Sequence, residues 1–105
     1  MPASQPVFRA IADPTRREIL SMLAGEELSV GEVAARFDMT RPAVAKHLGI
    51  LREADLITVR SEGRRHVNRL KPEALKTVAD WLSYFDRFWD EKLAKLKSTL
   101  ENDND

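Results

Sequence analysis

The residues with the clearest chemistry lie between positions 39 and 59. Their order is a short polar turn, a segment with basic residues on one side, and a β-branched run. Thr40 is a favourable helix N-cap, and Pro42 suits the first helical turn, where a missing N–H costs nothing. Apolar residues at spacings of four and three predict one buried stripe on this helix: Val44, Leu48 and Leu51.

Five residues off this stripe can approach phosphates and base edges in the major groove of DNA. They are Thr40, Arg41, Ala43, Lys46 and His47. Arg41 and Lys46 are the strongest candidates for base or nearby phosphate contact. An ordinary amphipathic surface helix explains the same pattern, so the surrounding segments decide between the two interpretations.

The charge distribution favours a nucleic-acid partner, although the net charge is zero. Residues 41–71 carry eight Lys and Arg against three acids, a balance of 8 − 3 = +5. Residues 72–105 carry five bases and eight acids, a balance of 5 − 8 = −3. A basic middle segment is the expected footprint of phosphate binding.

The segments before residue 39 predict three helices. A short helix is expected over residues 5–12. Asp13 and Pro14 then form an N-cap and first-turn pair that starts a second helix through Leu23, which Gly25 ends. A Ser29-x-x-Glu32 capping box opens a third helix through residue 37. Two helices joined by three or four residues, the second one basic, have helix-turn-helix spacing.

The segments after the basic helix predict a wing. Residues 56–60 and 65–70 are β-prone runs with near-alternating patterning, and Gly63 between them can adopt a positive φ. Arg60, Arg64 and Arg65 at the tip and flanks are expected to contact phosphates. The alternative is solvated edge-strand charge, which guards against aggregation.

Residues 72–100 predict one long C-terminal helix, about 45 Å in length. Its aromatic and aliphatic residues offer more apolar surface than a domain this small can cover, which favours a dimer interface over completion of the monomer core. The expected interface residues are Phe8, Ile11, Trp81, Phe85, Phe88 and Trp89. A two-fold dimer would match a palindromic operator. The acidic residues 102–105 are expected to form a disordered tail.

The chain resembles the arsenic-repressor (ArsR/SmtB) family of bacterial winged-helix repressors. The resemblance rests on D-P-x-R-x-x-I-L at residues 13–20, P-A-V-x-x-H-L-x-x-L-x-x-A-x-L-I at 42–57, and G-R-x-x-x-x-x-L at 63–70. It implies a mainly α winged helix-turn-helix of order ααααββα, with one domain over residues 1–101. Members are typically homodimers that pair their first and last helices and repress by occupying double-stranded operator DNA.

The chain departs from the family where thiolate-sensing members bind metal. Ser29 and Gly31 stand where those members have cysteines, so soft-metal ligation there is chemically excluded. Other members use Asp and His between C-terminal helices, but here that segment has acids and no histidine. The resemblance is therefore to the metal-independent branch, which includes autorepressors, and no metal or cofactor is expected. His47 is interpreted as a polar contact, and His66 as facing solvent or phosphate.

Other functional classes have weaker support. The chain has no cysteine, which excludes disulfides. It also lacks a phosphate loop and a recognisable nucleophile arrangement, so no catalytic residues and no enzymatic activity are expected. No apolar run approaches a membrane span and no signal peptide is evident, which indicates a cytoplasmic protein. The remaining alternative is a winged helix that has lost DNA binding and serves as a protein-interaction module.

Overall fold

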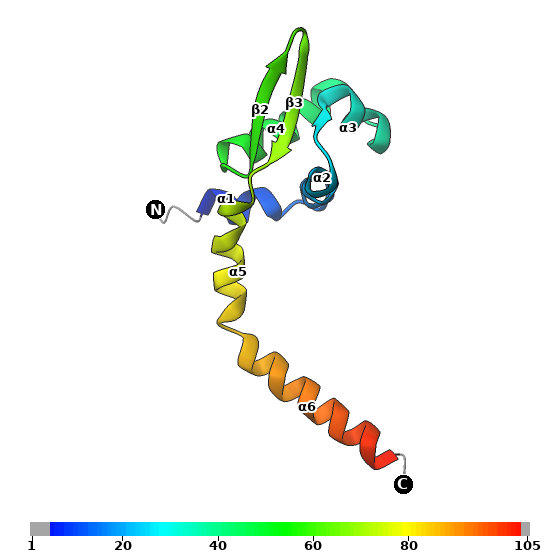
Figure 1. Ribbon diagram of the computed structural model, residues 1–105, viewed down its shortest axis with the longest axis vertical. Helices are drawn as coiled ribbons and strands as arrows, with labels where there is room; N and C mark the ends of the chain where they lie inside the picture. Colours follow the sequence, from blue (N-terminus) through cyan, green and yellow to red (C-terminus); the bar gives the residue numbers. More distant parts are fainter. Residues whose placement is uncertain (1–4, 104–105) are drawn as a thin grey trace.

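The computed structural model describes residues 5–103, which form a winged domain followed by an extended helical arm (Figure 1). The elements in chain order are α1 (Gln5–Ile11), α2 (Pro14–Gly25), β1 (Leu28–Ser29), α3 (Val30–Phe37), α4 (Arg41–Glu53), β2 (Ile57–Glu62), β3 (Arg65–Leu70), the 3-10 turn η1 (Pro72–Leu75), α5 (Lys76–Ser83) and α6 (Asp86–Asp103). The fold is the mainly helical winged helix-turn-helix expected from the sequence. No helix within residues 5–103 combines the length and apolarity needed to cross a bilayer.

The predicted N-caps of α2, α3 and α4 are all present. The Asp13 carboxylate accepts the N–H three residues on at 3.0 Å. The Ser29 hydroxyl accepts the N–H of Glu32 at 3.2 Å, and the Glu32 carboxylate accepts the N–H of Ser29 at 3.0 Å. The Thr40 hydroxyl accepts the N–H three residues on at 3.3 Å. Each cap satisfies an N–H that the helix cannot satisfy itself, which fixes where each helix begins.

The sheet contains one strand more than the predicted hairpin. Strands β2 and β3 pair antiparallel from Ile57↔Leu70 to Glu62↔Arg65, and Gly63 in the turn has φ 62°. Strand β1 adds to the other edge of β3, giving the order β1-β3-β2. A two-residue strand is too short to leave an alternating pattern in the sequence, which is why the periodicity did not reveal it.

One hydrophobic core joins α1 to α4 and the sheet. The whole predicted stripe of α4 is buried, together with apolar residues of α2 and α3, while Phe37 at the end of α3 is half-buried. Burying each such side chain contributes about 1.5–3 kcal/mol. The buried residues of these helices are Ile19, Leu20, Leu23, Val33, Ala34, Val44, Leu48 and Leu51. This core fixes the outward face of α4.

A long C-terminal helix is present as expected, in α6, but the expectation that it runs unbroken over residues 72–100 is wrong. The segment consists of η1, α5 and α6, with an interruption at Tyr84 and Phe85. The Ser83 hydroxyl donates to the carbonyl of Asp80 at 2.7 Å, so the N–H of Tyr84 bonds to Trp81 instead. Local serine bonds of this kind compete with the helical ladder. Spacing of apolar residues continues across the interruption, so the sequence pattern did not indicate it.

The α6 helix extends away from the winged domain (Figure 1), and the molecule measures 65 × 35 × 20 Å along its principal axes. It continues to Asp103, so the predicted start of a disordered tail at residue 102 falls inside the helix. The remainder of that tail, residues 104–105, lies outside the described residues. Residues 1–4 of the expected 1–101 domain also lie outside them.

Candidate nucleic-acid interface

The helix-turn-helix consists of α3 and α4 joined by residues 38–40. Asp38 adopts φ 54° at the end of α3, which turns the chain sharply toward the Thr40 cap. The buried stripe of α4 leaves the other faces of the helix outward. Of the five expected contact residues, Thr40, Arg41 and Lys46 are exposed, whereas Ala43 and His47 are half-buried.

His47 contacts a side chain that the sequence analysis did not single out. Its Nδ1 lies 3.4 Å from Nη1 of Arg16 in α2. Nε of Arg16 also donates to the carbonyl of Ala10 at 2.6 Å, at the end of α1. One guanidinium therefore joins α1, α2 and α4, so His47 is positioned within the protein as well as near the outward face. A D-P-x-R motif alone does not show this contact, because its partner lies 31 residues away.

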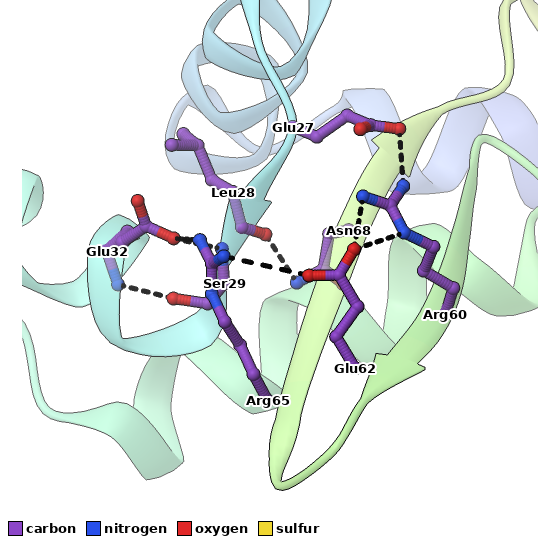
Figure 2. A network of polar contacts seen from close by, with 8 residues as sticks. All are labelled: Glu27, Leu28, Ser29, Glu32, Arg60, Glu62, Arg65 and Asn68. Atoms are coloured by element: carbon purple, nitrogen blue, oxygen red, sulfur yellow. Dashed lines mark hydrogen bonds and ion pairs between the residues drawn. The ribbon is translucent and has the colours of Figure 1, made fainter.

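Two of the three wing arginines, Arg60 and Arg65, are engaged in ion pairs along the wing (Figure 2). Arg60 lies 2.7 Å from Glu27 and 2.8 Å from Glu62. Arg65 pairs with Glu32, and its Nη1 lies 3.8 Å from Glu62. Within residues 5–103, Arg64 at the tip makes no ion pair. The wing therefore presents less free positive charge than its composition indicates.

Part of this network could have been read from the sequence. Residues 60 and 62 share one face of a strand, and residues 62 and 65 pair across a two-residue turn. Glu27 and Glu32 could not be assigned in this way, because they are 33 residues from their arginine partners. The packing of β1 against β3 places these two acids beside the wing.

Buried Asn68 supports that packing. It is 1% exposed, and its Nδ2 donates to the carbonyl of Leu28 at 3.1 Å (Figure 2). An unsatisfied amide at such depth would be costly, so this hydrogen bond ties β3 to β1. The base of the wing is thereby fixed relative to α3.

The ion pairs shift the pKa values of their members. The pKa of Glu32 falls from 4.5 to about 2, mainly because the N–H of Ser29 donates to the carboxylate, and also because of Arg65. The pKa of Glu27 is lowered chiefly by its hydrogen bond with Arg60, whose own pKa is raised. These carboxylates therefore stay charged at neutral pH.

We expect the Glu32→Gln variant to be less stable than the wild type at neutral pH, with the difference disappearing in acid. Because folding lowers the pKa of this carboxyl, its stabilisation is fully present above pH 4.5 and is lost as the pH falls toward 2. Urea unfolding of both proteins across that range measures the difference, with Glu18→Gln as control. A difference that stays constant with pH would contradict the role given to this carboxylate.

The aromatic residues of α5 and α6 form a second surface. Phe8 of α1 meets Trp81 edge to face, with ring centroids 5.6 Å apart, and Trp81 meets Phe85 at 5.2 Å. Phe85 is half-buried, but Trp81, Phe88 and Trp89 are 54%, 48% and 63% exposed. Ile11 is partly buried against the core. Further along α6, Leu93, Leu96 and Leu100 are more than half exposed.

Within residues 5–103, no group of three or more His, Asp or Glu side chains is placed to hold a metal ion. The arrangement instead provides an exposed helix with basic residues, a wing beside it, and a separate apolar surface.

Comparison with known proteins gives consistent matches. A family model described as a helix-turn-helix domain matches residues 11–60. The transcriptional repressor SdpR of Bacillus subtilis is 34% identical over 87 residues, covering 83% of this chain and 97% of SdpR. The HTH-type transcriptional regulator Rv2034 of Mycobacterium tuberculosis is 38% identical over 98 residues, covering 93% of this chain and 89% of that protein.

The solved structures agree with the sequence matches. An ArsR-like transcriptional regulator from Rhodococcus sp. RHA1 has a TM-score of 0.74 at 33% identity, covering 95% of this chain and 92% of that chain.

Proposed function

Because the chain belongs to the ArsR family of winged helix-turn-helix transcriptional regulators, we propose that it is a homodimeric repressor of a palindromic operator. The observation that supports this most is the pair of surfaces in one small domain. An outward basic face on α4 suits DNA, and an exposed aromatic surface on α5 and α6 suits a second copy of the chain. The name of the relative SdpR describes that protein as a repressor, which supports the same role here.

In this proposal the N-terminal half of α4 enters the major groove. Thr40, Arg41, Ala43, Lys46 and His47 face the DNA. Lys46 is exposed and has no ion-pair partner within residues 5–103, so its ammonium is available for a base edge or a phosphate. His47 keeps its contact with Arg16 and faces the backbone of the DNA from a fixed position.

The wing contributes phosphate contacts through Arg60, Arg64 and Arg65. Arg64 makes the largest contribution, since no ion pair within the described residues holds its guanidinium. To bind a phosphate, Arg60 and Arg65 must first give up a carboxylate partner. Each therefore contributes less binding free energy than an arginine that has no partner to lose. The wing therefore adds affinity that is independent of sequence.

The dimer forms around a two-fold axis beside α1, α5 and α6. Phe8, Ile11, Trp81, Phe85, Phe88 and Trp89 pack across this axis, and the exposed leucines of α6 extend the contact. Two recognition helices would then lie about one DNA turn, roughly 34 Å, apart.

DNA release by this repressor does not depend on metal. The support is chemical, since Ser29 and Gly31 offer no thiolate where thiolate-sensing relatives bind metal. We expect zinc, cadmium or arsenite to leave operator affinity unchanged in a fluorescence anisotropy titration, with EDTA-treated protein as the reference. A stoichiometric metal that lowers the affinity tenfold, about 1.4 kcal/mol of coupling, would contradict this expectation.

Selection of bound sequences from a random duplex library tests the proposed function. A palindromic consensus bound by a dimer, with affinity that falls steeply as salt rises, is the expected result, because counterions are released from the DNA. Absence of binding to any duplex at low salt would favour the protein-interaction module instead. Sedimentation of the free protein and of the complex gives the stoichiometry.

A further inference from the structure

An open cleft of about 380 Å³ lies between the helix-turn-helix and the wing. It is lined by residues 29–31 at the start of α3, by Arg41 at the start of α4, and by Arg64, Arg65 and His66 of the wing. Its volume lies at the lower end of the range of ligand pockets, roughly 300–1,000 Å³. The cleft therefore joins the segments proposed to contact DNA.

The lining of the cleft is strongly cationic. Three guanidinium groups reach it from two segments that lie more than 20 residues apart in sequence. Arg65 is paired with the carboxylate of Glu32 and also lies near Glu62. Within residues 5–103, Arg41 and Arg64 make no ion pair. Two uncompensated guanidinium groups at one cleft favour an anion, and their forked donors match the oxygens of a phosphate.

Gly31 allows Arg41 to reach the cleft. A Cβ atom added at Gly31 would lie 2.9 Å from Nη2 of Arg41, which is too close for a normal contact. The guanidinium therefore lies across the start of α3. A side chain at position 31 would displace the flexible end of Arg41 and leave the backbone in place.

Part of the hydrogen-bonding capacity at the N-terminus of α3 is occupied within the protein. Its capping box already uses the N–H of Glu32 and the N–H of Ser29. His66 is also engaged, with Nδ1 at 3.3 Å from the Ser61 hydroxyl. The uncompensated positive charge of the cleft thus lies in the guanidinium groups of Arg41 and Arg64.

We propose that the cleft is an oxyanion site in which Arg41 and Arg64 hold one phosphate group between helix α4 and the wing. The group is a backbone phosphate of bound DNA or the phosphate of a small free molecule, and the two share the same chemistry. Where DNA supplies the phosphate, the assignment rests on the proposed function. Either source fixes the wing relative to the recognition helix.

The Gly31→Ala variant tests the site when DNA supplies the phosphate. We expect its affinity for operator and for random duplex to fall by the same factor, roughly tenfold, with the salt slope reduced by about one per cleft. The matched control is Gly25→Ala, because a Cβ there meets nothing within 4 Å. Arg41→Ala and Arg64→Ala should each weaken binding, and their combination should cost less than the sum, since one phosphate is shared.

A titration without DNA tests whether a free phosphate binds in the cleft. Inorganic phosphate is added at constant ionic strength, with chloride as the balancing anion, and the amide resonance of Gly31 is followed by NMR. Saturable shifts that Arg41→Ala and Arg64→Ala abolish identify a free phosphate as a ligand. A weaker DNA affinity of Gly31→Ala without such shifts in the wild type identifies the DNA backbone as the source of the phosphate. Either result supports the site.

The proposal is overturned if Gly31→Ala matches Gly25→Ala in DNA affinity and salt slope, and the wild type shows no saturable phosphate shift. Thermal unfolding of both glycine variants confirms that each is folded. If the wild type binds no DNA, the proposed function fails, but the phosphate titration still decides whether the cleft binds an oxyanion.

Discussion

Replacing Phe88 by glutamate is expected to dissociate the dimer and to remove tight operator binding in the same step. Phe88 is 48% exposed in the single chain and lies beside Phe85, with ring centroids 6.3 Å apart. A two-fold axis would bury this ring twice, at about 1.5–3 kcal/mol for each. A carboxylate in its place would have to be buried without a partner in each subunit, which is costly.

The expected loss is large because a monomer contacts only one half-site. Operator affinity should fall on the order of 1,000-fold, toward the affinity for random DNA. Sedimentation and anisotropy measure assembly and binding separately, while circular dichroism follows the winged core, which should remain folded. Ala94→Glu is the matched control, since it adds the same charge to α6 about 120° around the helix from Phe88. A Phe88→Glu protein that is still dimeric would show that the two-fold contact lies elsewhere.

The second large effect is expected for Lys46→Ala. Lys46 lies on the outward face of α4, away from the buried stripe. Its loss should weaken operator binding by about 1–3 kcal/mol if the ammonium reads a base, with little change for random duplex. If it contacts only phosphate, both affinities should fall equally and the salt slope should become shallower by about one per subunit.

The control for this variant is Lys95→Ala, which removes the same charge from α6, far from the helix-turn-helix, at a position whose neighbours on the same helix face are polar. That variant should leave both affinities unchanged. An unaltered operator affinity and salt slope in Lys46→Ala would remove Lys46 from the interface. Thermal unfolding should be equal in the two variants, because neither side chain is buried.

The winged helix-turn-helix could be predicted because its signals are local. The caps at Asp13, Ser29 and Thr40 and the apolar spacing of α4 each depend on residues within one or two helical turns. The interruption after Ser83 was not predictable from spacing, because apolar residues continue at the same period on both sides. There the Ser83 hydroxyl donates a hydrogen bond to the carbonyl of Asp80, in place of the helical hydrogen bond from the N–H of Tyr84.

The candidate contact residues could be proposed from the sequence, but their electrostatic environment could not. Arg60, Arg64 and Arg65 are indistinguishable as basic residues on a hairpin. Only the three-dimensional packing of β1 places Glu27 and Glu32 beside two of them and leaves Arg64 at the tip. The same long-range packing brings residues 29–31 and the wing together with Arg41 around one cleft. Long-range pairings of this kind leave no periodic trace in one sequence.

The ion pairs of Arg60 and Arg65 along the wing also bear on how quickly such a regulator finds its target in a genome. Arg60 and Arg65, each matched by a carboxylate, add little net field at a distance, and the whole chain is neutral. Weak attraction to arbitrary duplex shortens each unproductive encounter and leaves fewer molecules sequestered on the roughly 10⁶–10⁹ competing sites. A wing whose arginines are partly neutralised by carboxylates of the same chain therefore favours a low copy number of the regulator, because fewer molecules suffice to keep one operator occupied.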